Sequence, residues 1–261
     1  MIKKISFKNR GGRRIVGIIN LPKGKPPFPA VIICHGFKGY KEQIILKSLA
    51  EVLARAGILA LRFDFTNGVG QSFGPLEDIR FKTGISDLRA AVDFLVKQKI
   101  VDDNRIGLAG HSLGGQMILY YAPTDRRIKV LADLAGVIQW GNNEIAQEIK
   151  VRKNFAAIKK AGYYLVESRG KKRKYKVKLS FIFDMFKINA LGRIKKIRVP
   201  TLIVHGSKDE SVPLCQSRRA YKTLIAPKKL VIIKGAPHTW RAPKFYQQIN
   251  PEVTAWFKKY L

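Results

Sequence analysis

The chain has 261 residues, of which 46% are hydrophobic and 26% charged, and this composition excludes a mostly disordered protein. Two cysteines, Cys34 and Cys215, are too few for a disulfide framework or a four-cysteine metal site. Fifty Lys and Arg against 18 Asp and Glu give a net charge of +32, a field that attracts nucleic acid or anionic membranes without specificity. No apolar run is long enough to span a membrane, and the first residues do not resemble a secretory signal. We therefore expect a soluble, cytoplasmic protein.

The pattern along the chain alternates between strands and helices. Two strands are expected first, around a Gly11-Gly12 turn, and short apolar runs of strand length follow. Amphipathic segments with apolar residues three and four positions apart lie between these runs. The alternation predicts an α/β fold with a mostly parallel, doubly wound sheet. The predicted strands are 2–8, 13–20, 30–34, 58–63, 105–109, 130–134, 202–204 and 230–233, and the helices are 42–56, 83–98, 112–121, 214–224 and 245–257.

Residues 139–198 interrupt this alternation. They hold 17 basic and 4 acidic residues, a higher density of positive charge than the rest of the chain has. We expect a helix over 142–160, a hairpin formed by 163–168 and 174–181, and a short helix over 184–191. The organisation predicted is an α/β core, residues 1–138 and 199–261, with an inserted cap at 139–198.

The basic run from Arg169 to Lys178 contains seven cations. We favour a solvated hairpin as its interpretation, and the alternative is attraction of acidic substrates or of an anionic surface. No RNA-binding signature accompanies the run, so a specific nucleic-acid partner is not expected.

The motif with the clearest chemistry is Gly110-His111-Ser112-Leu113-Gly114, which fits the pattern G-x-S-x-G. It follows a predicted strand and opens a predicted helix, which is the context that this motif requires. Small residues are needed there because the serine occupies a tight strand-to-helix turn. The helix N-terminus also favours negative charge developing nearby. Ser112 is therefore our candidate nucleophile.

A serine hydroxyl needs a base, and the base needs an acid that orients it. After this motif the expected order along the chain is serine, acid, histidine. Asp209 and His238 follow two later predicted strands, so they belong to the same sheet edge as Ser112. We assign His238 as general base and Asp209 as the acid, with Glu210 as a less favoured alternative for the acid.

The chemistry of acyl transfer also requires two donors for an oxyanion. We expect the backbone N–H groups of Leu113 and Phe37 to supply them, because Phe37 lies in the glycine-containing loop after an early strand. The other three histidines, His35, His111 and His205, are expected to have structural roles, with His205 in a loop. No metal-ligand spacing is present, and neither a metal nor a cofactor is expected.

Together these motifs resemble the α/β-hydrolase superfamily, and more closely the bacterial cinnamoyl/feruloyl esterases and the dienelactone-hydrolase-like carboxylesterases. The resemblance covers nearly the whole chain. It implies an α/β-hydrolase fold, a small cap over the site, cleavage of carboxylic esters and no cofactor. One departure is that the loop after Asp64 lacks the histidine usual in those esterases. The residues that carry the resemblance are His35-Gly36-Phe37-Lys38-Gly39, Arg62-Phe63-Asp64-Phe65, Gly110–Gly115, Gly206-Ser207-Lys208-Asp209 and His238.

The function expected is a serine carboxylesterase that forms an acyl-enzyme on Ser112 and acts on a small-molecule ester of short acyl or aryl type. A thioesterase, a peptidase or a perhydrolase would use the same three residues, so the sequence leaves these open. A non-catalytic binder of nucleic acid or membrane is the alternative that the +32 charge suggests. A homodimer is also left open.

Overall fold

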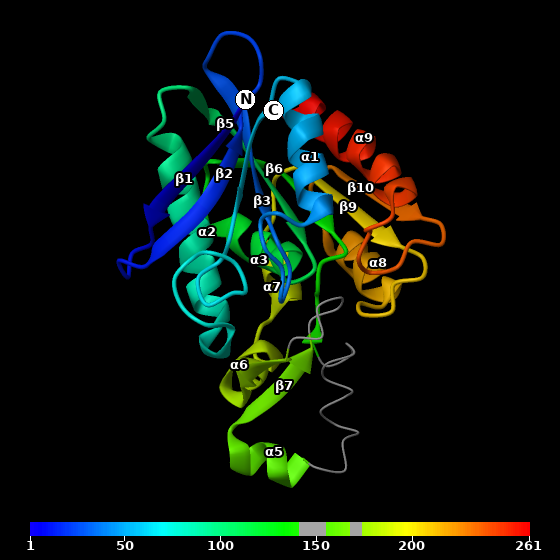
Figure 1. Ribbon diagram of the computed structural model, residues 1–261. Helices are drawn as coiled ribbons and strands as arrows, with labels where there is room; N and C mark the ends of the chain where they lie inside the picture. The colour runs from blue at the N-terminus through cyan, green and yellow to red at the C-terminus, as the bar shows by residue number, and fades with distance from the viewer. Residues whose placement is uncertain (141–154, 168–173) are drawn as a thin grey trace.

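The computed structural model describes residues 1–140, 155–167 and 174–261. Within them, eight strands form one sheet in the order β1-β2-β4-β3-β5-β6-β9-β10. β1 pairs with β2 and β2 with β4 in antiparallel fashion, and all other neighbours are parallel. The mostly parallel sheet expected from the sequence is thus confirmed (Figure 1). The strands are β1 (Ile2–Lys8), β2 (Arg14–Asn20), β3 (Phe28–Cys34), β4 (Leu59–Phe63), β5 (Val101–His111), β6 (Ile128–Leu134), β9 (Thr201–Gly206) and β10 (Lys228–Ile233).

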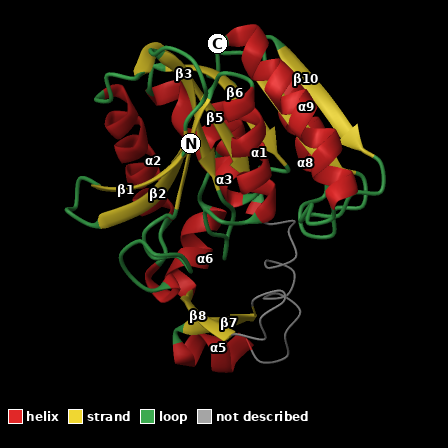
Figure 2. Cartoon of the chain, turned by 45° about the horizontal axis from the view of Figure 1, so that its top comes forward, coloured by secondary structure: helices red, strands yellow, loops and turns green. Residues whose placement is uncertain are grey.

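Helices cover both faces of this sheet. One face packs on α1 and α9, and the other packs on α2, α3 and α8 (Figure 2). Successive side chains of β3 alternate between these two cores, because neighbouring residues of a strand point to opposite faces. Val31 and Ile33 join the core under α1 and α9, while Ala30 and Ile32 join the other core. The helices are α1 (Ile44–Arg55), α2 (Phe81–Val96), α3 (Leu113–Tyr121), α8 (Leu214–Thr223) and α9 (Pro243–Tyr260), with single 3₁₀ turns η1 (Leu76–Asp78) and η2 (Ala122–Thr124).

The segment between β6 and β9 contains α5 (Phe155–Ala161), the hairpin β7 (Tyr163–Glu167) and β8 (Lys174–Lys178), then α6 (Leu179–Phe186) and α7 (Ala190–Ile194). The hairpin was expected, but its second strand does not reach Phe181. Residues 179–186 form a helix instead, because Leu179, Ile182 and Met185 recur at helical spacing and are buried. The short helix predicted at 184–191 is therefore wrong in its bounds. Most of the helix predicted at 142–160 and the centre of the basic run lie outside the described residues.

The carboxyl ends of the parallel strands lie at one edge of the sheet. β3 leads into His35, β5 into Ser112, β9 into the turn that carries Asp209, and β10 into the loop that carries His238. Ligands of open α/β sheets bind at this edge. It is also the edge from which the segment after β6 extends (Figure 1).

Candidate active site

Ser112 is the single residue between β5 and α3, and its backbone is strained. Its φ is 57° and its ψ is −118°, a conformation that residues with a Cβ atom rarely adopt. Backbone hydrogen bonds hold it there. The Ser112 N–H donates to Leu134 O of β6, and Ser112 O accepts from the N–H groups of Gln116 and Val137. The hydroxyl is thereby fixed at the start of α3 and directed into a cavity.

The glycines around Ser112 are required by packing. A methyl group on Gly114 would lie 2.5 Å from Cys34 O and 2.6 Å from His35 O, both backbone atoms at the end of β3. A methyl group on Gly36 would lie 2.9 Å from the Cβ atom of Ser112 itself. The turn that presents the serine is thus locked between its own helix and the loop after β3.

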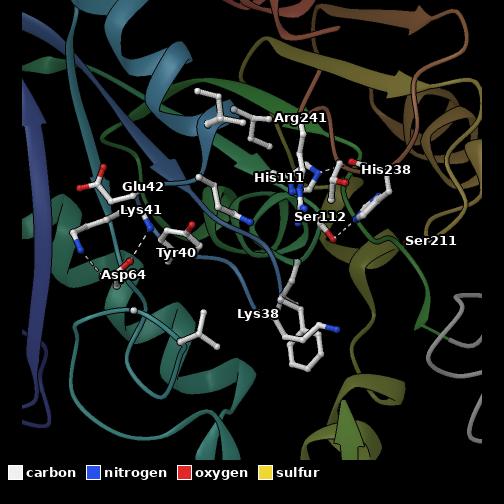
Figure 3. A pocket seen from close by; sticks show the side chains of 18 of the residues that line it. Lys38, Tyr40, Lys41, Glu42, Asp64, His111, Ser112, Ser211, His238 and Arg241 are labelled. Atoms are coloured by element: carbon white, nitrogen blue, oxygen red, sulfur yellow. Dashed lines mark hydrogen bonds and ion pairs between the residues drawn. The ribbon is translucent and has the colours of Figure 1, made fainter. Parts of the chain in front are cut away.

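His238 links Ser112 to Asp209. Its Nε2 is 2.9 Å from Ser112 Oγ, and its Nδ1 is 2.8 Å from Asp209 Oδ2 (Figure 3). A carboxylate oxygen accepts, so Nδ1 carries the proton and donates to Asp209. In the neutral ring Nε2 is then unprotonated and accepts the Ser112 hydroxyl proton. The structure thus brings together the three side chains that the sequence nominated, from loops after three different strands.

The side chain of Asp209 is buried and surrounded by donors. Its Oδ1 accepts from the backbone N–H groups of Ser211 and Val212, at 2.9 and 2.7 Å. Burial alone would raise the pKa of Asp209, but hydrogen bonds from His205 and His238 outweigh it, and the pKa lies well below its ordinary value. Asp209 is therefore ionised at neutral pH.

Glu210, the alternative acid, lies elsewhere. One of its carboxylate oxygens accepts the backbone N–H of His238 at 3.0 Å. Glu210 thus anchors the loop of His238, whereas Asp209 contacts the imidazole ring.

His205 was expected in a loop with a structural role, and its position corrects this expectation. It lies within β9, its side chain is fully buried, and its Nε2 is 3.2 Å from Asp209 Oδ2. Sequence reasoning missed this contact, because nothing in the order of residues shows which way a strand residue faces relative to the following turn.

His111 and His35 support the loops that surround Ser112. His111 Nε2 donates to the backbone oxygen of His238 at 2.9 Å, and burial, aided by the nearby His238, lowers the pKa of His111 to about 3. His35 Nε2 accepts the N–H of Phe65 at 3.1 Å, so His35 Nδ1 carries the proton and donates to Gly36 O. Both rings remain neutral connectors between segments that are distant in the chain.

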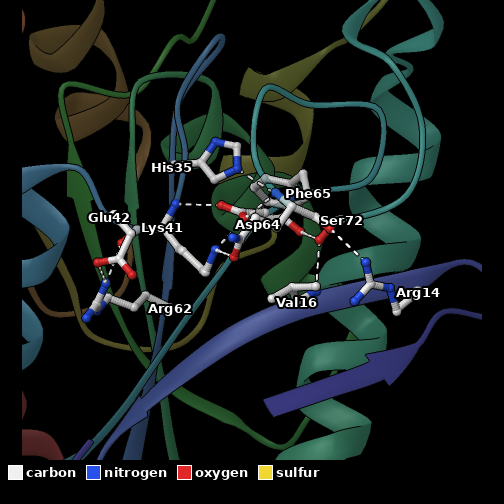
Figure 4. Close-up of polar contacts among 10 residues, drawn as sticks. Arg14, Val16, His35, Lys41, Glu42, Arg62, Asp64, Phe65 and Ser72 are labelled. Carbon is white, nitrogen blue, oxygen red and sulfur yellow. Dashed lines mark hydrogen bonds and ion pairs between the residues drawn. The ribbon is translucent and has the colours of Figure 1, made fainter. Parts of the chain in front are cut away.

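A buried ion pair fixes the loop after β3. Lys41 Nζ is 2.7 Å from Asp64 Oδ2, and the Lys41 backbone N–H donates to Asp64 Oδ1 (Figure 4). Arg62, also buried, donates to Lys41 O and to Glu42. These contacts attach the loop that carries Phe37 to the end of β4.

The two proposed oxyanion donors flank the serine. Leu113 is the first residue of α3, so its N–H has no partner inside the helix. Phe37 follows Gly36, which packs against Ser112, and both Phe37 and Leu113 line the same cavity as the serine. Their roles as donors stay predictions.

The cavity has a volume of about 870 Å³. Ser112 and His238 lie on one side of it, and Lys41, Glu42 and Asp64 on the other (Figure 3). Its wall also has apolar side chains from several elements, which suits a substrate with a hydrocarbon part. These are Val16, Ile18, Ile44, Ile45, Val69, Val137, Trp140 and Val212.

No group of three or more His, Cys, Asp or Glu residues in the described ranges is arranged to hold a metal ion. Among the helices that the structure describes, none combines the length and apolar character needed to cross a membrane.

Comparisons with known proteins point to hydrolases. The model of the prolyl oligopeptidase family matches residues 47–261. The structure of Est1E from Butyrivibrio proteoclasticus with bound ferulic acid is similar, with a TM-score of 0.78, 26% identity and 98% of both chains covered. The thiohydrolase aneE of Aspergillus aculeatus is 31% identical over 61% of this chain and 51% of its own. An uncharacterised 31.7 kDa Escherichia coli protein from the traX-finO intergenic region is 24% identical over 92% of this chain and 94% of its own.

Proposed function

Because the chain belongs to the prolyl oligopeptidase family and has the α/β-hydrolase fold, we propose that it is a serine hydrolase that cleaves carboxylic esters. The observation that carries the proposal is the connected series Ser112 Oγ, His238 Nε2, His238 Nδ1 and Asp209 Oδ2, with contacts of 2.9 and 2.8 Å. The similarity to Est1E, whose structure holds ferulic acid, supports an ester as the substrate.

In the proposed reaction, Ser112 Oγ attacks the ester carbonyl carbon while its proton passes to His238 Nε2. The resulting oxyanion accepts the N–H groups of Leu113 and Phe37. When the tetrahedral intermediate collapses, the bond to the alcohol breaks and His238 gives its proton to the departing oxygen. Water then attacks the acyl-enzyme by the same steps, which releases the acid and restores Ser112.

The organisation into a core and a cap over residues 139–198 belongs to the same proposal. In the described part of this segment, Phe181 stacks on Phe37 with ring centroids 5.8 Å apart. Lys38 Nζ donates to the backbone oxygen of Glu167 at 2.6 Å, and Tyr175 lines the cavity. These contacts support a cap that shapes the substrate pocket.

A thioester is the second candidate substrate, favoured by the similarity to a thiohydrolase. The three side chains would act in the same way, with a thiolate in place of the alkoxide as leaving group. A serine hydrolase accepts either acyl donor if the pocket fits it, so relative kcat/KM values decide between the two.

The test is to label the protein with a fluorophosphonate and to locate the adduct by mass spectrometry, then to compare nitrophenyl esters, acyl thioesters and peptide anilides. We expect one adduct on Ser112 and higher kcat/KM for esters than for anilides. Ser112→Ala and His238→Ala should each lower kcat/KM about 10⁴-fold or more. Unlabelled protein, or variants as active as the parent chain, would refute the proposal and favour a binding role for the positive charge.

A further inference from the structure

A second histidine contacts the carboxylate of Asp209. Asp209 Oδ2 lies 2.8 Å from His238 Nδ1 and 3.2 Å from His205 Nε2. His205 is the penultimate residue of β9, and it pairs with Ile232 in the neighbouring strand β10, which leads to His238. A single carboxylate oxygen therefore lies between two imidazole rings that are presented by adjacent strands.

The contacts of His205 determine where its proton is. Nε2 is 2.9 Å from the backbone oxygen of Val212, and Nδ1 is 2.7 Å from Ser217 Oγ. A carbonyl oxygen only accepts, so Nε2 must carry a hydrogen. In the neutral ring Nδ1 then accepts from the Ser217 hydroxyl. The Nε2–H group faces both Val212 O and Asp209 Oδ2, while Asp209 Oδ1 is held by two backbone N–H groups.

We infer that His205 is a positioning residue for the reaction proposed above: it orients the Asp209 carboxylate and moderates the basicity of His238. The inference rests on the proposed function. His205 does not line the cavity, its contacts are with Asp209, Val212 and Ser217, and the contact that links it to His238 is the one with Asp209. Its Nε2–H bonds to Val212 O and also lies 3.2 Å from Asp209 Oδ2, the oxygen on which the His238 Nδ1–H depends.

The contact with Oδ2 has an effect of definite sign. A donor on Oδ2 spreads the negative charge of the carboxylate, so less of it is available to stabilise protonated His238. Removing the Nε2–H of His205 should strengthen the attraction between Asp209 and the imidazolium, and thus move the acidic limb of the pH profile. The carboxylate would also lose one of the contacts that orient it, which should lower the maximal rate.

Other ionisable groups surround this pair, and none of them is substituted when only residue 205 is changed. Comparing variants at residue 205 therefore isolates the contribution of His205 itself. The surrounding ionisable groups are His111 at the end of β5, Asp133 in β6, Glu210 beside Asp209 and Arg241 in the loop after His238.

The test compares His205→Leu with His205→Gln. Leucine fills similar space without a donor, whereas the amide nitrogen of glutamine lies as many bonds from Cα as Nε2 and restores a donor. The dependence of kcat/KM on pH is measured for each, and the pKa of His238 is measured in parallel by NMR titration. For His205→Leu we expect the acidic limb and the NMR titration to move up by about one pH unit, with a maximal kcat/KM about 10-fold lower. His205→Gln should restore both toward the parent values.

The matched control is Thr201→Val, which alters a buried hydroxyl at the first residue of the same strand, whereas His205 lies near its end; this hydroxyl bonds to Val199 O. It should lower the melting temperature without moving the acidic limb. The inference is overturned if both His205 variants keep the parent pH profile, if both shift it equally, or if Thr201→Val shifts it too. Should the parent chain neither hydrolyse esters nor label at Ser112, the proposed function fails, and the NMR titration still decides whether His205 sets the pKa of His238.

Discussion

Asp209→Asn should nearly abolish activity, because the structure dictates how the new amide would be oriented. Oδ1 of Asp209 accepts two backbone N–H groups, so the amide oxygen of asparagine must take that position. Its NH₂ group then replaces Oδ2 and faces His238 Nδ1, which is 2.8 Å away in the parent protein. A donor there forces the His238 proton onto Nε2, and Nε2 can no longer accept the proton of Ser112.

The size of this effect follows from the wrong tautomer. In a serine hydrolase with intact geometry, such a change costs about 10⁴-fold in kcat, which corresponds to about 5.5 kcal/mol of barrier. Nitrophenyl ester kinetics over a range of pH would measure it, and fluorophosphonate labelling should slow in parallel. The melting temperature should change far less than the rate.

Glu210→Gln is the matched control for this substitution. It alters a neighbouring carboxylate whose contact is the backbone N–H of His238, and the amide oxygen of glutamine can still accept that bond. The expected loss of kcat is below 10-fold, the range of one ordinary hydrogen bond. Equal losses in the two variants, or a larger loss for Glu210→Gln, would refute the assignment of Asp209 as the orienting acid.

Three further outcomes follow from packing and burial. Gly114→Ala should destabilise the fold by about 1–3 kcal/mol in urea unfolding and lower kcat/KM, because its methyl group would clash with the backbone oxygens of Cys34 and His35. Stability equal to that of the parent chain would show that the backbone there moves aside at little cost. Burial raises the pKa of Asp133 from 3.8 to about 7. Between about pH 4 and 7 the folded chain therefore holds a proton on Asp133 that the unfolded chain releases. Because of this, the contribution of Asp133 makes the free energy of unfolding fall as pH rises through this range. Asp133→Asn should flatten that fall in melts taken across this range, and an unchanged slope would contradict it. Lys41→Met should cost about 3–5 kcal/mol by removing the cation that pairs with the buried carboxylate of Asp64. Adding Asp64→Asn, which removes the charge and keeps an oxygen for the Lys41 N–H, should recover part of the loss, as urea titrations of both would show.

Much of the fold and the central part of the site were predictable because they depend on short local patterns. The strand before Ser112, the glycines beside it and the helix after it stand together in the sequence, and the structure arranges them as that pattern requires. Asp209 and His238 could be nominated because parallel strands end at a common edge. Each lies in the first loop after its strand.

What escaped prediction depends on side-chain direction and on contacts over long sequence separations. The ion pair of Lys41 with Asp64 joins the loop after β3 to the loop after β4, and neither residue alone indicates the other. The role of His205 depends on the orientation of one carboxylate oxygen. The start of helix α6 was predicted as part of a strand. Its aromatic residues favour strands, and the helix has only eight residues in which a helical pattern could be recognised.

The adjacency of β6 and β9 has a consequence for how this chain can diversify. β6 and β9 are hydrogen-bonded neighbours, so the backbone leaves the sheet after Leu134 and returns to it, at Thr201, in the adjacent strand. The intervening stretch is an insertion between two strands that the sheet already holds side by side. Exchanging the part of it that follows Trp140 would keep the hydrogen bond from Val137 to Ser112, and it would keep the strands that lead to Ser112 and His238. Under the proposed function, grafting that part between relatives should alter the selectivity and keep the reaction.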